Sequence, residues 1–364
     1  MYRLFFVAFF MSLLCINVSP QSLDTINLSL SEQQFIDSIA LLNVKNEQLK
    51  ASRDSYNSGL LLLEDENYID AIDYFTKAII IDSVFIAPYL SRARCYHGIN
   101  DELAITDYRT AFYLDSTNLK CLYSIATLQL KSDRILAKKT YQTIVSLNKT
   151  EYKAYSQLGV IAFLDKEYQD AEQLFSQSLA VNTNAYTLND RGSCYRRLEQ
   201  FDNAIEDYLA AIKLDNSLAF VYNNLASVYA KKGETEKALG YYDLAISKDV
   251  NYALAYNNKG SVLLENKEYD KASSVIEEAL IVNNQYAPAY NNQGVMHHQL
   301  KRYNDAIAAF DTAISIDENY AKAYLNRGIS KQMIRDEDGA CLDWKKANEL
   351  GVIVAKKYFS NDCE

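Results

Sequence analysis

An alanine recurs along this chain at an almost constant interval, and this interval limits the fold more than any other feature. Consecutive members are 33 or 34 residues apart. A large apolar residue follows each alanine by four positions, and a small residue follows by seven positions in every repeat except the one with Ile144. A fixed period in this range is typical of solenoid proteins. The alanines are Ala71, Ala104, Ala137, Ala171, Ala204, Ala238, Ala272, Ala306 and Ala340.

A second small residue lies upstream of each alanine and serves as a second marker of the repeat. We expect two helices in each repeat, both with an apolar stripe and joined by a short turn. Small residues let the helix axes approach closely, and the large apolar residue fills the remaining space. No such unit buries its stripe alone, so neighbouring repeats must stack. The upstream markers are Gly59, Ala93, Ala126, Gly159, Gly192, Ala226, Gly260, Gly294 and Gly328.

The repeat resembles the tetratricopeptide repeat, a helix–turn–helix unit, most clearly in residues 219–252. The resemblance covers residues 52–351 and implies an all-α, right-handed superhelical solenoid of about nine tandem repeats with terminal capping helices. The Pro that closes the family's second helix is missing, and Ser, Thr or Asn mostly stands in its place, where these residues favour turns. The residues that carry the resemblance are Tyr222, Leu225, Ala226, Tyr229, Ala238, Tyr242 and Ala245.

Residues 1–20 resemble a secretory signal peptide, with Arg3 before an apolar run from Leu4 to Ile16. This run is short for a membrane span. Two alternatives stay open, an uncleaved membrane anchor and a lipid-modified Cys15, although Leu14 stands where bacterial lipoproteins favour a small residue. We therefore expect the mature chain to be secreted, periplasmic or held in the cell envelope.

Both ends of the repeat array need a cover, because terminal repeats expose apolar surface. In residues 21–51 we expect a helix whose stripe of Phe35, Ile39 and Leu42 closes the first repeat. In residues 352–364, after the helix-stopping Gly351, we expect a C-terminal capping helix and tail. An apolar end also suits a dimer contact, so the oligomeric state stays open. The apolar residues of the C-terminal segment are Val352, Ile353, Val354, Tyr358 and Phe359.

The position of each cysteine within the repeat array indicates its environment. Cys95 and Cys194 take the same place on the first helix of their repeats, where the family favours a small buried residue, so we expect both in the core. They lie too many repeats apart to form a disulfide with each other. Cys341 and Cys363 form the pair that a folded-back terminal helix can join, and the sequence leaves this pairing open.

Composition and motifs argue against several function classes. The chain has 37 basic and 47 acidic residues, whereas a nucleic-acid partner calls for clustered Lys and Arg. The sequence contains no phosphate-binding loop, nucleophile elbow or metal-ligand spacing. The three histidines, His97, His297 and His298, do not form a catalytic pattern. We therefore expect no catalytic residue, cofactor or metal site.

A polar position recurs two residues before each upstream marker. In the last four repeats it is Asn224, Asn258, Asn292 and Asn326, and Asp190 precedes them. A carboxamide has both a donor and an acceptor, so a regular series of them can hold the backbone of an extended peptide. This series resembles the asparagine ladder of some peptide-binding members of the family. The competing interpretation is that these residues only cap or solvate their helices.

Cations lie near the ends of two first helices. Arg196, Arg197 and Lys231 form a potential basic patch in an acidic protein, suited to an acidic peptide or a terminal carboxylate. The competing interpretation is that they stabilise the helix dipole.

These observations predict a non-catalytic scaffold that binds an extended peptide segment of a partner protein in the concave groove of the solenoid. The alternative is a structural subunit of a cell-envelope assembly that docks through its outer face and its ends. An enzyme is a third, more distant reading. We expect no nucleic-acid partner, and a membrane association only through an uncleaved signal or a lipid anchor.

Overall fold

The computed structural model describes residues 30–363, so the expected signal peptide at residues 1–20 lies outside the described residues. Nineteen α-helices and no strand make up this part of the chain. This confirms the all-α fold of tandem helix pairs, while the handedness of a superhelix stays a prediction. None of the helices in residues 30–363 is long and apolar enough to cross a bilayer.

The chain divides into two compact units, with the boundary between Leu128 and Gln129 inside helix α6. The helices before this boundary are α2 (Leu30–Glu64), α3 (Tyr68–Ile81), α4 (Ile86–Tyr96) and α5 (Asp101–Leu114), and α6 (Leu119–Ser132) crosses it. The helices after it are α7 (Arg134–Leu147), α8 (Tyr152–Leu164), α9 (Tyr168–Val181), α10 (Ala185–Arg197), α11 (Phe201–Leu214), α12 (Ala219–Lys231), α13 (Thr235–Lys248), α14 (Ala253–Glu265), α15 (Tyr269–Val282), α16 (Ala287–Gln299), α17 (Tyr303–Ile316), α18 (Ala321–Met333), α19 (Glu337–Glu349) and α20 (Ala355–Asp362).

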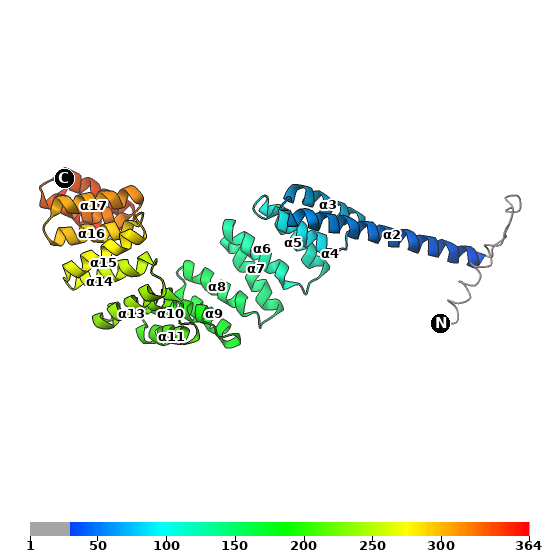
Figure 1. Ribbon diagram of the computed structural model, residues 1–364, viewed down its shortest axis with the longest axis horizontal. Coiled ribbons are helices and arrows are strands. Elements are labelled where there is room, and N and C mark those ends of the chain that lie inside the picture. The colour runs from blue at the N-terminus through cyan, green and yellow to red at the C-terminus, as the bar shows by residue number, and fades with distance from the viewer. Residues whose placement is uncertain (1–29, 364) are drawn as a thin grey trace. The chain divides into compact units, whose positions relative to one another are not determined.

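Helix pairs stack in chain order within the second unit (Figure 1). Each even-numbered helix from α8 to α18 is the first helix of a repeat and packs on the odd-numbered helix that follows it. That second helix also contacts the first helix of the next repeat. First helices of adjacent repeats touch as well, from α8 to α18. The first helices therefore form one continuous layer inside this unit.

The two markers meet at the seam between the helices of a repeat. The recurrent alanines are fully buried, and the large residue four positions later lies against the upstream marker. A Cβ added at Gly294 would lie 2.5 Å from the Phe310 ring, and one added at Gly328 would lie 2.6 Å from Trp344 Nε1. The glycine is thus required by a close approach of helix and ring, as the spacing predicts.

Asp or Asn ends most second helices, in place of the missing Pro. These residues lie one position before the Ser, Thr or Asn that the sequence pattern indicated. In all of these turns except the one after Asn182, the side-chain Oδ1 accepts a hydrogen bond from the backbone N–H two residues later, as between Asp215 and Ser217 at 2.9 Å. Such local bonds offer the backbone an alternative to helix continuation. The other such residues are Asp82, Asp115, Asn148, Asp249, Asn283 and Asp317.

Three repeats contain a buried ion pair that the sequence analysis did not identify. Arg191 donates from Nε and Nη2 to both carboxylate oxygens of Asp207, at 2.8 and 2.7 Å, and from Nη1 to Ser176 of the preceding repeat. This one arginine therefore joins three helices. Hydrogen bonding to Asp207 raises the pKa of Arg191 further above its ordinary value. The equivalent pairs are Arg92 with Asp107 and Arg327 with Asp343.

The N-terminal helix differs from the expected cap. Helix α2 continues without a break into the first helix of the first repeat. Residues 33–48 are exposed, including Phe35 at 54%, Ile39 at 39% and Leu42 at 56%. The apolar stripe therefore does not close the first repeat. Residues 30–58 contain no Pro or Gly, so the chain extends as one helix instead of folding back.

The C-terminal helix α20 packs on α19, as a cap does. Ala355 is fully buried, and Tyr358 lies 5.1 Å from Trp344 between ring centroids. The expected contribution of Ile353 and Val354 is wrong, because they are 84% and 46% exposed. The Phe359 side chain lies outside the described part.

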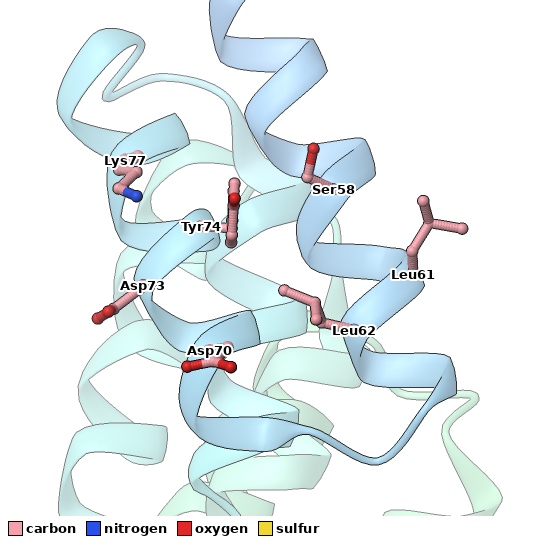
Figure 2. Close-up of a pocket in the computed structure, with 7 residues that line it drawn as sticks. All are labelled: Ser58, Leu61, Leu62, Asp70, Asp73, Tyr74 and Lys77. Atoms are coloured by element: carbon pink, nitrogen blue, oxygen red, sulfur yellow. The ribbon is translucent and has the colours of Figure 1, made fainter.

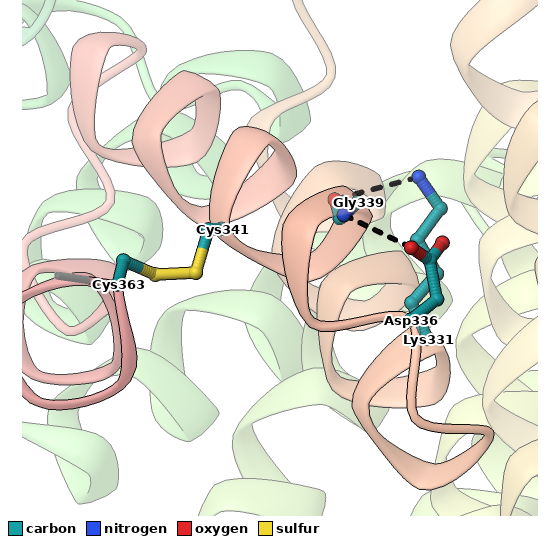
Figure 3. The surroundings of a disulfide bond; sticks show 5 residues. All are labelled: Lys331, Asp336, Gly339, Cys341 and Cys363. Carbon is teal, nitrogen blue, oxygen red and sulfur yellow. Dashed lines mark hydrogen bonds between the residues drawn. A yellow bond between two sulfur atoms is a disulfide. The ribbon is translucent and has the colours of Figure 1, made fainter.

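A disulfide between Cys341 and Cys363 joins α19 to the end of the chain (Figure 3). The pairing that the sequence left open is thus formed. Cys95, Cys121 and Cys194 are free and buried, which confirms the core position of Cys95 and Cys194.

The close helix contact at the seam predicts that a Gly→Ala substitution has opposite effects on stability at Gly294 and at Gly240. Gly294→Ala forces the buried Phe310 ring to move, so we expect a loss of about 1–3 kcal/mol in the free energy of unfolding. Gly240→Ala is the matched control, because its Cβ would meet no atom within 4 Å. There we expect a gain of up to about 1 kcal/mol from helix propensity. Urea denaturation measures both, and a Gly294→Ala protein as stable as the wild type would contradict the seam.

The disulfide predicts a local effect at the C-terminal end. Replacing Cys341 and Cys363 by Ser removes a cross-link over 22 residues, worth about 3 kcal/mol for a loop of this size. We expect α20 to fray and Trp344 to gain water contact, because Tyr358 no longer covers it. The chain has a single Trp, so its emission reports this change directly. Unchanged emission and unchanged amide exchange in α20 would show that the cap holds without the bond.

Candidate functional site

The first helices α10, α12, α14, α16 and α18 place the predicted polar residues in one series within the second unit. We call this series the asparagine column: Asp190, Asn224, Asn258, Asn292 and Asn326. All five side chains are half-buried. Since adjacent first helices are in contact, the column runs across five consecutive repeats. The structure thus brings together the residues that the sequence register aligned.

A second series lies beside the column, formed by the asparagines one position before Asp190, Asn224, Asn258 and Asn292 in the sequence. This buried asparagine row consists of Asn189, Asn223, Asn257 and Asn291, each less than a tenth exposed. A buried carboxamide is costly unless its polar atoms find partners. Each row residue therefore needs hydrogen-bond partners within the fold.

The column supplies these partners. Asn224 Nδ2 donates to Asn189 Oδ1 at 2.8 Å, and Asn258 Nδ2 donates to Asn223 Oδ1 at 3.0 Å. Asn292 and Asn326 repeat the same bond to Asn257 and Asn291, both at 2.9 Å. Each of the four column asparagines thus bonds to a row residue 35 positions earlier, in the preceding repeat.

This network bears on the choice between a peptide-binding ladder and a purely structural role for the column asparagines. Asn224, Asn258, Asn292 and Asn326 have a structural role, because each joins two repeats. An amide has two N–H donors and a carbonyl acceptor, and the inter-repeat bond uses one N–H. Within residues 30–363 the Oδ1 atoms of the four asparagines accept no hydrogen bond. One acceptor therefore remains at each position, with the amide held in a fixed orientation. One N–H also remains at Asn224, Asn258 and Asn326, whereas Asn292 Nδ2 makes a second bond, to the backbone oxygen of Asn257 at 3.3 Å.

Apolar residues occur one helical turn before the column and share its helix face. Tyr186 precedes Asp190 by four residues, and Phe220 and Leu254 precede Asn224 and Asn258 in the same way. Tyr186 is 61% exposed and lies 5.9 Å from the Phe220 ring. The face therefore has an apolar strip beside its carboxamides.

The predicted basic patch separates into two environments. Arg197 and Lys231 follow the column by seven residues on α10 and α12, are exposed, and share the column's face. Arg197 also lies 5.6 Å from the Tyr168 ring centroid. Arg196 lines a cavity between α8, α9 and α10 instead. The three cations therefore do not act as one patch.

Asp190 is the acidic member of the column. Burial raises its pKa to about 6 from an ordinary value of 3.8, against the opposing effect of a hydrogen bond from Asn189 at 3.2 Å. In the other four repeats this place holds a neutral asparagine. The charge of Asp190 thus distinguishes the α10 end of the column.

Another opening lies in the first unit, where Leu62 and Tyr74 occupy the space between α2 and α3 while Leu61 points away (Figure 2). Its volume is about 500 Å³, and Asp70, Asp73 and Lys77 line it with the residues above and Ser58. Lys77 Nζ lies 4.6 Å from the centroid of the Tyr74 ring. These groups do not form a catalytic arrangement.

Metal-ligating side chains do not gather in groups of three or more in the described part of the chain. Among the histidines, His298 Nδ1 lies 2.9 Å from the Ser330 hydroxyl, and burial lowers the pKa of His298. This ring takes part in packing between α16 and α18.

Comparison with protein families identifies the repeat. A model described as TPR repeat matches residues 192–233, and models described as tetratricopeptide repeat match residues 221–251, 253–286 and 287–320. These stretches contain the asparagine column from Asn224 to Asn292.

Similar proteins agree with this identification over limited lengths. The DnaJ homolog subfamily C member 7 of Mus musculus is 34% identical over 110 residues, which cover 29% of this chain and 21% of that protein. A tetratricopeptide repeat protein from Parabacteroides merdae has a TM-score of 0.58 at 18% identity, covering 66% of this chain and 97% of the other. The C-terminal part of a TPR repeat-containing protein from Cytophaga hutchinsonii gives 0.53 at 19% identity, covering 65% and 98%. At these identities the two structures show a shared fold.

The pKa of Asp190 predicts a pH-dependent stability. Its folded-state pKa lies above the ordinary value, so the stability it contributes is present below pH 3.8 and is lost as the pH rises through about 6. Asp190→Asn keeps the acceptor for Asn189 and removes the buried charge. We expect the variant to have a higher thermal midpoint than the wild type at neutral pH, with the two converging in acid. A difference that does not change with pH would show that Asp190 titrates normally.

Proposed function

We propose that this chain, which is a tetratricopeptide repeat protein, acts as a non-catalytic scaffold that holds an extended peptide segment of a partner along the asparagine column. Tandem repeats of this kind support a protein-interaction role. The observation that carries the proposal is the set of free Oδ1 atoms on Asn224, Asn258, Asn292 and Asn326, oriented by bonds to the buried asparagine row.

The column suits a peptide backbone for a chemical reason. A backbone offers alternating N–H and C=O groups. Each of the four column asparagines offers an acceptor, and Asn224, Asn258 and Asn326 also offer a donor. Preorganised amides lose little freedom on binding, which favours affinity. The apolar strip with Tyr186, Phe220 and Leu254 gives side chains of the segment a surface to cover.

We propose an extracytoplasmic location on two grounds. Residues 1–20 have the pattern of a secretory signal. The Cys341–Cys363 disulfide is a bond that persists in oxidising compartments and is rare in a reducing cytoplasm.

A second candidate function is docking to a larger assembly through the ends and the outer face. The exposed apolar side chains of Phe35, Ile36, Ile39 and Leu42 on α2 favour it, because such clusters mark contact surfaces. Both functions are compatible with one chain, and they place the partner on different residues.

Photo-crosslinking in intact cells separates the two candidates. A crosslinking residue at position 261 lies three residues after Asn258 on the column's face, whereas one at position 281 lies on α15, where Ile281 is 76% exposed. We expect a partner to be captured from position 261 and not from position 281. Capture only from position 281, or from α2, would favour docking and contradict the column.

Substitutions in the column give the quantitative test. Serine occupies the column position in earlier repeats, at Ser91 and Ser124, so N224S/N258S/N292S is compatible with the repeat. We expect the captured peptide segment to bind at least about tenfold more weakly, because several hydrogen bonds of about 1 kcal/mol each are lost. The matched control N216S/N284S/N304S alters three exposed asparagines elsewhere. Titration calorimetry with equal affinities for both variants would refute the ladder.

A further inference from the structure

A cavity of about 240 Å³ lies beside the α10 end of the asparagine column. Its apolar walls come from two helices of one repeat: Val160, Phe163 and Leu164 on α8, and Phe175 on α9. Its polar wall comes from α10 of the next repeat, with Asp190, Ser193 and Arg196. We call this site the α8–α10 cavity.

Two polar side chains of the cavity, Arg196 and Asp190, each have an atom without a hydrogen-bond partner. Arg196 Nε is buried and makes no hydrogen bond within the described residues. An unpaired buried donor is costly, so an acceptor placed here gains more than a typical surface contact. Asp190 accepts only the bond from Asn189 on its Oδ1, which leaves its second oxygen free. The Ser193 hydroxyl is already paired with Tyr208 at 3.1 Å.

The cavity's size and charge limit its occupant. Pockets for drug-sized ligands measure about 300–1,000 Å³, so this one fits a single side chain rather than a cofactor. At neutral pH most of the Asp190 carboxyl is ionised, since burial raises its pKa to about 6. Asp190 and Arg196 then balance each other in charge. A neutral occupant with one acceptor and one donor therefore matches the site better than an anion.

We propose that the α8–α10 cavity binds a large apolar residue of the peptide segment, such as Leu or Phe, whose backbone carbonyl accepts from Arg196 and whose backbone N–H donates to Asp190. The apolar side chain lies between Val160, Phe163, Leu164 and Phe175. This inference rests on the proposed peptide-binding function and deepens it, because the column holds a backbone without selecting a sequence. The cavity supplies the selection and fixes the register of the segment.

The test uses the full chain and a single-residue probe, N-acetyl-leucinamide, which has one side chain and a complete set of backbone amides. Methyl NMR signals of Val160 and Leu164 report binding at the cavity itself. We expect saturable shifts of both signals. N-acetylglycinamide lacks the side chain and is expected to bind at least about tenfold more weakly. No saturable shift in the wild-type chain, or equal binding of the two probes, overturns the proposal.

Two variants isolate the polar part of the site. Arg196→Met keeps the apolar stem and removes the donors, so we expect about tenfold weaker binding of N-acetyl-leucinamide. Arg197→Met is the matched control, because the neighbouring residue is exposed and does not line the cavity. Equal effects of the two variants would overturn the assignment of Arg196. Should Arg196→Met not fold, Arg196→Gln serves in the same comparison.

A carboxylate probe tests the charge argument. N-acetyl-leucine carries an anion where the amide probe is neutral. We expect it to bind more weakly, because a site in which Asp190 and Arg196 balance each other does not offset the cost of removing the anion from water. Tighter binding of the anion would overturn the proposed internal residue and indicate a terminal carboxylate.

The column variant separates this inference from the proposed function. The probe measurement uses N258S/N292S, because Asn224 bonds to Asn189, which itself donates to Asp190 of the cavity. N258S/N292S leaves both the cavity residues and Asn189 intact, so we expect unchanged binding of N-acetyl-leucinamide. If this probe binds the cavity but the column variant still holds the peptide segment at full affinity, the ladder fails and the cavity stands. If the column variant loses the segment but no probe enters the cavity, the cavity proposal alone is wrong.

Discussion

The rest of the structure depends on the close contact between a small residue on the first helix and a large side chain on the second. Gly294 and Phe310 show the constraint most sharply, because even one added carbon would lie 2.5 Å from the ring. This contact sets the distance between the two helices of a repeat and so the surface that the next repeat meets. Since protein interiors are close-packed, an error at one seam is transmitted to its neighbours. The period of 33 or 34 residues in the sequence follows from this packing requirement.

Stacking of the repeats buries polar side chains, and residues at equivalent positions of the next repeat supply their hydrogen-bond partners. Asn223 is buried by the packing of α12, and its carbonyl finds its donor on Asn258 of the following repeat. The ion pair of Arg191 and Asp207 answers a similar need between helices. Because the bonds between asparagines join adjacent repeats, the column acquires its fixed geometry only in the stack. One isolated repeat has the residues of the site without their orientation.

Several features followed from the sequence because they are periodic. The register placed Cys95 and Cys194 in the core and Asn224, Asn258 and Asn292 on one face, since residues at equivalent positions have equivalent surroundings. Features that break the period were harder to predict. Helix α2 continues past residue 51, where we expected the capping helix to end, and Phe35 is exposed. An apolar stripe alone does not indicate which surface covers it. The α8–α10 cavity arises where one repeat has Asp190 in place of Asn, and its volume depends on side chains from two repeats.

The sequence by itself determined the repeat, the helix pairs and the alignment of the column, because each follows from spacing along one chain. The tertiary structure decided which atoms of those asparagines are used and which remain free. It also separated Arg196 from Arg197 and Lys231, and it brought Cys341 to Cys363. The physical reason is that hydrogen bonds and burial depend on distances between residues far apart in the sequence. A period fixes where a side chain lies on its own helix, and only packing fixes what it meets.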